Sequence, residues 1–144
     1  MELAISLPIL TVMLVGAIDF GRVFRTAMIV QNAARAGALY GSQNLGKTTD
    51  ITGMQNTATN VLTINGLTGA GSVVGSRLCQ CASDSGVFSV TVPPNTCGYT
   101  CPSGGHMVYS VTVQATRTFS MTNAFPGLPT SITITRAASM RAMP

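Results

Sequence analysis

The chain has 144 residues, of which 46% are hydrophobic and only 8% charged, whereas about 25% are charged in an ordinary soluble domain. This composition excludes a disordered chain, which needs low hydrophobicity and high charge. It also argues against a free cytosolic monomer, because so few surface charges keep copies apart poorly. The net charge of +4 comes mostly from scattered arginines. Because they form no basic run, we expect no nucleic-acid partner.

Acid–base enzymes need groups that this chain has in small number. It contains one histidine, His106, and four carboxylates, Glu2, Asp19, Asp50 and Asp84, which are spread along the chain. Neither an HExxH nor a GxSxG motif occurs. We therefore expect a protein that is not an enzyme and has no catalytic residues, metal site or cofactor.

The N-terminal segment predicts a long helix. Residues 3–18 carry no charge, and as a helix they would cover about 24 Å. Such a segment is too apolar for a surface helix. Asp19 and Arg22 follow at a spacing that lets them pair at a membrane–water boundary. Good helix formers continue to about Tyr40, so we expect one helix over about 2–40, kinked at Pro8.

The same segment divides the chain in two. A chain of this length cannot bury so much apolar helix in its own core. A cleaved signal peptide is disfavoured, because no basic residue precedes Arg22. We therefore predict a retained hydrophobic stem over residues 1–27, for a membrane or an assembly core, and a globular head over 28–144.

Small residues and one charge mark candidate packing positions. Ala33, Gly37 and Gly41 recur at every fourth position, which lets helix backbones approach closely. This stripe packs either on the chain's own head or on another helix. Glu2 stands beside the apolar segment, where an isolated carboxylate is costly. It either lies in the headgroup layer or pairs with a positive group, such as the α-amino group of a neighbouring chain.

Residues 41–48 match the phosphate-binding pattern G-x-x-x-x-G-K-[ST]. That chemistry needs a buried strand before the loop and a helix after it. Here the preceding segment, 33–40, reads as helix, so we reject a nucleotide site. We expect a helix end, with Thr49 or Asp50 capping the next helix.

The head predicts an α+β fold. Apolar residues between 51 and 62 share one helical face, so a second helix is expected over 50–65, ended by Gly66. Alternating patterns then predict strands over 87–92, 107–116 and 131–136, with a possible strand over 72–79. The predicted fold is therefore a long N-terminal hydrophobic helix, a short second helix and an antiparallel sheet.

The four cysteines, Cys79, Cys81, Cys97 and Cys101, all lie in the head. An even number in one exported domain indicates two disulfides. Because a bond between Cys79 and Cys81 would be strained, both bonds should cross the 82–96 loop, in either of two connectivities. A Cys₄ zinc site is the less favoured alternative, since the spacing is not the usual paired C-x₂-C. His106 is expected to be an exposed loop residue.

Several pieces of the sequence carry a family resemblance. An acid precedes an apolar segment with an early proline, Asp-Phe-Gly-Arg follows, and a stretch rich in alanine, glycine and arginine comes next. The pieces are Glu2-Leu3-Ala4, Leu7-Pro8, Ile18-Asp19-Phe20-Gly21-Arg22, Asn32-Ala33-Ala34-Arg35-Ala36-Gly37-Ala38, and in the tail Phe125-Pro126-Gly127-Leu128-Pro129 and Ala137-Ala138-Ser139-Met140-Arg141. Together they resemble the TadE-type pilin-like proteins of tight-adherence loci, closely over about 2–45 and less closely over 110–142.

The resemblance implies a structural subunit of the wider type IV pilin class. Such proteins are anchored in the inner membrane, trimmed by a prepilin peptidase, and packed stem to stem by pilus assembly machinery into an extracellular filament used for surface attachment. On this interpretation the chain is a homo-oligomer in a helical filament. The candidate subunit-packing residues are Glu2, Pro8, Asp19, Arg22, Ala33, Gly37 and Gly41.

Two alternative functions are also compatible with the sequence. A minor pseudopilin would prime or cap a filament, or serve a secretion machine, without forming its bulk. A membrane-anchored extracellular binding module would instead capture DNA or a surface ligand through the four arginines Arg77, Arg117, Arg136 and Arg141, and its affinity would depend on salt.

Overall fold

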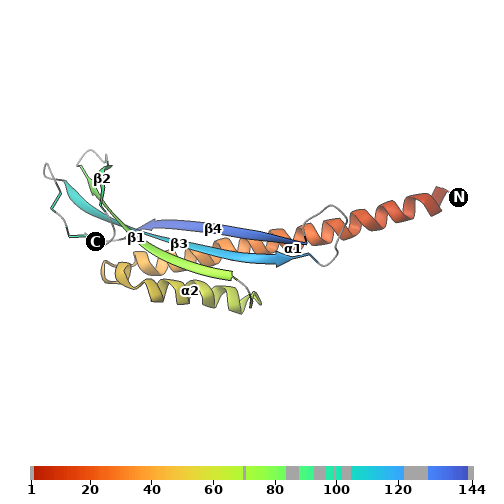
Figure 1. Cartoon of the computed structure of the whole chain (residues 1–144), viewed down its shortest axis with the longest axis horizontal. Helices are drawn as coiled ribbons and strands as arrows, with labels where there is room; N and C mark the ends of the chain where they lie inside the picture. Colours follow the sequence, from red (N-terminus) through yellow and green to blue (C-terminus); the bar gives the residue numbers. More distant parts are fainter. Residues whose placement is uncertain are drawn as a thin grey trace.

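The computed structural model describes residues 2–69, 71–83, 88–92, 97–98, 100–101, 105–121 and 130–142, and side chains are described for all of these except 2–5 and 88–92. Within these ranges the chain forms two α-helices, a short 3₁₀ helix and one antiparallel sheet (Figure 1). The elements are α1 (Glu2–Ser42), η1 (Gly46–Thr49), α2 (Ile51–Ile64), β1 (Gly71–Ala82), β2 (Phe88–Val92), β3 (His106–Ser120) and β4 (Ser131–Arg141). The predicted α+β fold is therefore confirmed.

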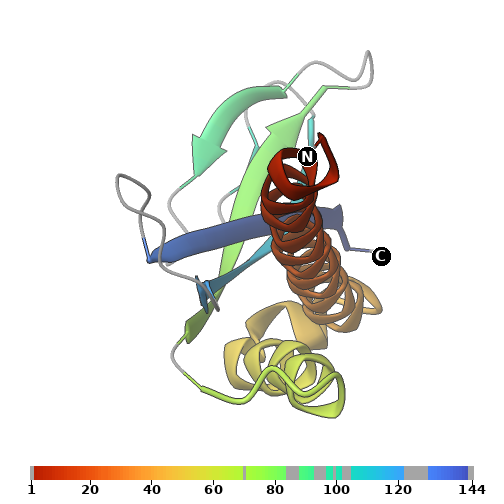
Figure 2. The same cartoon turned by 90° about the vertical axis from the view of Figure 1, so that its right-hand side faces the viewer.

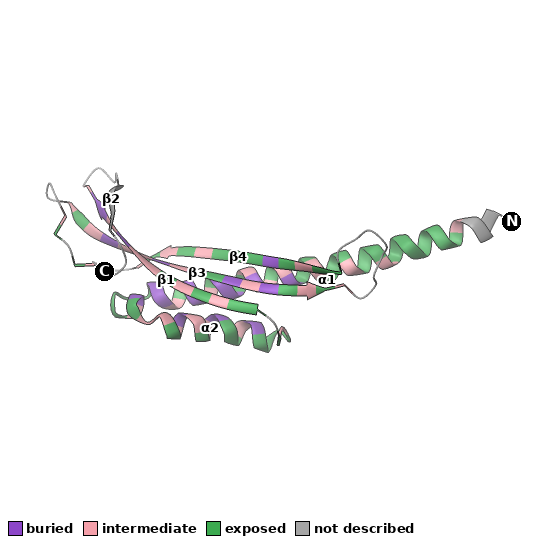
Figure 3. Ribbon diagram, viewed as in Figure 1, coloured by how far each residue is buried: buried purple, intermediate pink, exposed green. Residues whose placement is uncertain are grey.

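Helix α1 has two different surroundings along its length. Its N-terminal half extends beyond the sheet, and its C-terminal half lies along it (Figure 1). The exposure of the residues follows this division, with a largely exposed first half and a second half that alternates between buried and exposed positions (Figure 3). One continuous helix thus serves both the stem and the core of the head.

The sheet has the strand order β2-β1-β3-β4, with every neighbouring pair antiparallel. Alternate residues of β3 that include Val111, Val113 and Ala115 are buried, because this face is covered by α1 and α2 (Figure 2). The opposite face carries mainly threonine and serine, and two cross-strand hydroxyl pairs bridge β3 and β4 there, Thr112 with Ser139 and Thr116 with Thr135.

The core is small and built from short side chains. Val30, Ala33, Ala34 and Ala38 of α1 contribute its first layer, and all four are fully buried. The remaining buried members of this cluster come from α2 and the sheet, namely Met54, Ala58, Leu62, Val111, Val113, Ala115 and Ile134. Because alanines line the buried face of α1, the helix can lie close to the sheet. A core this small leaves the head with little apolar surface that could cover the stem.

Local signals set the bounds of α2. The carboxylate of Asp50 accepts a hydrogen bond from the backbone N–H of Gly53 at 2.8 Å, which caps the helix N-terminus. The helix ends before Gly66, whose φ of 77° is left-handed and therefore favours glycine. The Asp50 cap is one of the two that the sequence left open, and the helix stops at Gly66 as expected.

The strands differ from the sequence expectation in extent. The segment expected only as a possible strand is the 12-residue β1, which pairs with both β2 and β3. Strand β4 runs to Arg141 rather than ending at 136, because its whole length pairs with β3. His106 is exposed as expected, but it begins β3 and is not in a loop. Residue 87 and the 125–129 motif lie outside the described residues.

Candidate functional site

The surface that distinguishes this molecule is the described part of the predicted stem, residues 6–27 of α1. Large apolar side chains along it are more than half exposed, among them Leu10 at 64%, Met13 at 69% and Phe20 at 72%. Among the described residues, one helix, counted over 6–42, is long and apolar enough to cross a membrane by length and composition, and only 6% of its most apolar window is buried. Twenty residues of helix cover about 30 Å, the thickness of a bilayer's hydrocarbon core.

Charges appear on α1 where the stem approaches the sheet. Arg22 and Asp19 form an ion pair at 3.4 Å, as their spacing predicts. The guanidinium of Arg22 also lies over the ring of Phe119 on β3, 5.5 Å from its centroid. Phe20 and Phe24, which lie close to the pair along the chain, have exposed aromatic rings. Aromatic and charged side chains together are typical of a membrane–water interface.

The first turns of α1 contain two of the predicted packing residues. Glu2 is helical, but its side chain lies outside the described part of the structure, so its pairing stays a prediction. The helix continues through Pro8, and the hydroxyl of Thr11 donates a hydrogen bond to the Pro8 carbonyl at 2.8 Å. Pro8 is exposed, as are the stem side chains around it.

The small-residue stripe packs inside the subunit. Ala33, Gly37 and Gly41 are all buried. A Cβ on Gly37 would lie 2.8 Å from the carbonyl oxygen of Met54 and 3.1 Å from the Cγ1 atom of Val113. The stripe therefore brings α1 close to α2 and β3. Within the single subunit, the stripe thus makes the intrachain contact that the sequence left open as one of two alternatives.

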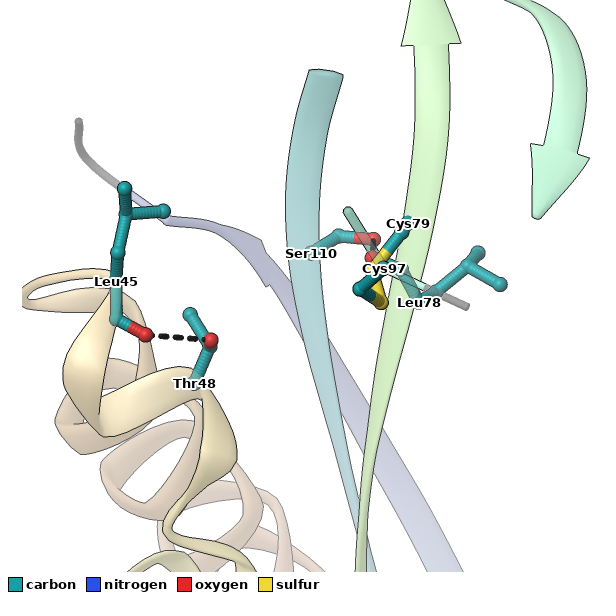
Figure 4. Close-up of a disulfide and its surroundings, with 6 residues drawn as sticks. All are labelled: Leu45, Thr48, Leu78, Cys79, Cys97 and Ser110. Atoms are coloured by element: carbon teal, nitrogen blue, oxygen red, sulfur yellow. Dashed lines mark hydrogen bonds between the residues drawn. A yellow bond between two sulfur atoms is a disulfide. The ribbon is translucent and has the colours of Figure 1, made fainter. Parts of the chain in front are cut away.

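The phosphate-binding pattern of residues 41–48 has no P-loop geometry. Gly41 is still within α1, and Gly46–Thr49 form η1, so a helix and not a strand precedes the glycines. The hydroxyl of Thr48 is buried and donates to the Leu45 carbonyl at 2.7 Å (Figure 4). Lys47 lies 4.5 Å from the centroid of the Tyr40 ring. These side chains close the turn between α1 and α2.

A hydrogen bond fastens the same turn to α1. The hydroxyl of Tyr40 donates to the carboxylate of Asp50 at 2.8 Å. The Gly53 N–H, the Tyr40 hydroxyl and the nearby Lys47 charge together hold the pKa of Asp50 below its ordinary value. The pKa of Tyr40 is raised, first by its bond to Asp50 and then by partial desolvation and the carboxylate's charge.

Two disulfides crosslink the end of the head that lies farthest from the stem. The structure pairs Cys79 with Cys97 (Figure 4) and Cys81 with Cys101, with Cα atoms 5.7 and 5.6 Å apart. This is one of the two connectivities that the sequence left open. Cys79 and Cys81 are buried and lie on β1, between β2 and β3. Because all four sulfurs are bonded, they do not supply the thiolates that a zinc site needs.

The four arginines proposed for a binding module do not form one surface. The register places Arg77, Arg117 and Arg136 on the helix-covered face of the sheet and Arg141 on the other, since Arg141 is opposite Ser110. Arg117 is also buried. This separation could not be predicted from the positions of the arginines along the chain, because it depends on strand register.

The comparison with known families adds one finding. Residues 1–39 match the family described as TadE-like protein. The matched segment is the stem and the start of its contact with the head, and the match confirms the resemblance seen in the sequence. No curated protein and no solved structure matches the chain. The match covers the stem and does not extend over the sheet or α2.

Proposed function

We propose that this chain is a non-enzymatic structural subunit that assembles through its TadE-like stem into an extracellular pilus filament for surface attachment. Before assembly the stem anchors the subunit in the inner membrane, where the prepilin peptidase and the pilus assembly machinery act on it. The exposed apolar stem carries this proposal.

The energy of the stem supports the proposal. Ten large apolar residues between positions 7 and 28 are each more than half exposed, namely Leu7, Ile9, Leu10, Val12, Met13, Leu14, Ile18, Phe20, Phe24 and Met28. Covering each one recovers about 1 kcal/mol, or about 10 kcal/mol in total. This equals the whole folding stability of an ordinary domain, so the stem resides in lipid or against other apolar helices.

The arrangement of the head supports a subunit whose head lies outside the membrane in an oxidising exterior. The Asp19–Arg22 pair lets Arg22 lie at the edge of the head with its charge balanced. The head's outer sheet face is rich in hydroxyls, and its tip is held by two disulfides, which suits an oxidising exterior. A repeated stem contact that does not close into a ring generates a filament.

The test is the composition of surface filaments. Cells that express the chain with its assembly machinery are sheared, and the filaments are imaged by electron microscopy and analysed by mass spectrometry. The proposal expects this chain as the bulk of the filament protein. A trace amount in filaments made of another protein would assign it instead to the minor pseudopilins, and its absence from filaments would refute assembly.

A further inference from the structure

A cavity of about 380 Å³ lies where the stem meets the head, between α1, the turn after α2 and the end of β3. We call it the junction pocket and define it by Arg22, Arg25, Ile29, Leu67, Arg117 and Phe119. Its volume is that of many water molecules, each of which occupies about 30 Å³ in the liquid. The pocket therefore has room for a small ligand.

The guanidinium of Arg117 is built into this pocket. The side chain is only 9% exposed, and one Nη donates to the carbonyl of Gly69. Among the described residues, the buried side-chain nitrogen and oxygen atoms all have a hydrogen-bond partner except the Nε of Arg117. Gly71, directly opposite on β1, makes room for it, because a Cβ there would lie 2.9 Å from that Nε.

The charges around Arg117 leave the pocket positive. Arg25 is exposed at its mouth and forms no ion pair within the described part of the chain. Arg22 is paired with Asp19, which does not itself line the cavity. No carboxylate is among the described lining residues. A buried guanidinium with an unsatisfied donor is costly, so the pocket is complementary to an anion.

The position of the pocket selects the kind of anion. Arg22 and Arg25 end the membrane-length stem, so a stem inserted in a bilayer places them at the level of the lipid headgroups. Ile29, Leu67 and Phe119 add apolar wall beside the guanidinium groups. Arginine binds phosphate oxygens through parallel N–H donors. A phosphate joined to an apolar group therefore matches both kinds of lining.

We propose that the junction pocket binds the phosphate of an anionic phospholipid and so holds the subunit at a fixed depth in the membrane before assembly. The inference rests on the membrane-anchored state of the proposed function, but it does not require filament formation. A free phosphate ion shares the recognised chemistry and lacks the apolar part.

The test uses the full chain in micelles of an uncharged detergent, with ¹⁵N-labelled arginine. Short-chain phosphatidylglycerol, the matching phosphatidylcholine and inorganic phosphate are titrated separately, and the Nε–H signal of Arg117 is followed by NMR. We expect saturable shifts with phosphatidylglycerol at lower concentration than with either other probe. If inorganic phosphate bound with the same affinity as phosphatidylglycerol, the pocket would recognise phosphate alone, and the proposal of a lipid ligand would be refuted. The absence of a shift with any probe would overturn the site.

Two variants distinguish binding in the pocket from a general effect of the protein's net charge. Arg25→Gln removes one exposed guanidinium from the mouth and should weaken phosphatidylglycerol binding about tenfold. Arg35→Gln removes the same charge from an exposed position of the same helix, about 15 Å further along, and should leave the affinity unchanged. Equal weakening by the two variants would show a general charge effect and overturn the pocket. Because both positions are exposed, the test does not depend on a buried substitution that disturbs folding.

Discussion

Replacing Gly37 with alanine would place a methyl group in a contact that has no space for it. The added Cβ would lie 2.8 Å from the carbonyl oxygen of Met54 and 3.1 Å from the Cβ of Ala58. The nearer atom belongs to the backbone of α2, so it cannot turn aside as the end of a flexible side chain could. Helices α1 and α2 would have to separate along their contact.

Two opposing effects set the size of the change. Alanine is favoured over glycine in a helix by about 0.8–1 kcal/mol. Extra atoms forced into a packed core cost about 1–3 kcal/mol. We therefore expect Gly37→Ala to destabilise the head by about 1 kcal/mol net, which lowers Tm by about 4 °C for a domain of this size.

The assay is thermal unfolding of the full chain in detergent micelles, followed by circular dichroism. Gly21→Ala is the matched control, because Gly21 is in the same helix and nothing lies within 4 Å of the position its Cβ would take. The control should leave Tm unchanged or raise it. A Tm for Gly37→Ala that equals or exceeds that of the wild type would refute the close approach of α1 and α2.

Two further predictions concern the head. Replacing both Cys81 and Cys101 with serine opens the bridge across a sequence separation of 20 residues, so the free energy of unfolding measured by denaturant titration should fall by about 3 kcal/mol. The capping carboxylate of Asp50 has a lowered pKa in the folded chain. Its contribution is therefore present above the unfolded-state pKa of about 4 and is lost as pH falls through the folded value. The Tm difference between the wild type and Asp50→Asn should be largest near neutral pH and should become small at acidic pH.

Each of these predictions has its own control. Wild-type chain treated with a reductant should lose at least as much stability as the double serine variant, and an unchanged unfolding curve for that variant would contradict the prediction. For the cap, Tyr40→Phe removes one donor to Asp50 while the Gly53 N–H bond stays. The Tyr40→Phe variant should therefore show a smaller change of the Tm difference with pH, but the change should not disappear. A Tm difference that stays constant from neutral to acidic pH would contradict the assigned role.

The helices could be predicted from the sequence because their signals are local. An uncharged run followed by small residues gives α1, and Asp50 with Gly66 marks the bounds of α2. The stripe through Gly37 showed that a close contact exists, but the identity of the partner depends on tertiary packing. The structure supplies that partner as the head's own α2 and β3.

The sheet and the junction pocket depend on pairings that sequence periodicity does not report. Strand β1 contains Gly71 and Gly75, and glycine has a low preference for strands, yet a continuous ladder with β3 makes this strand central. The packing of α1 on the sheet brings Arg117 into one pocket with Arg22 and Arg25, which are more than 90 residues away in the chain. A scattered set of arginines therefore gave no signal of a shared pocket.

The central claim is that the exposed stem is covered by the stems of other copies in the filament. The most direct measurement is photo-crosslinking in sheared surface filaments, with a photoreactive phenylalanine analogue at Leu10, a residue that is 64% exposed in the single subunit. We predict a ladder of covalent multimers of this chain, with the crosslinks mapped to stem residues of the neighbouring copy. Crosslinks only to lipid or to a different protein would contradict the claim.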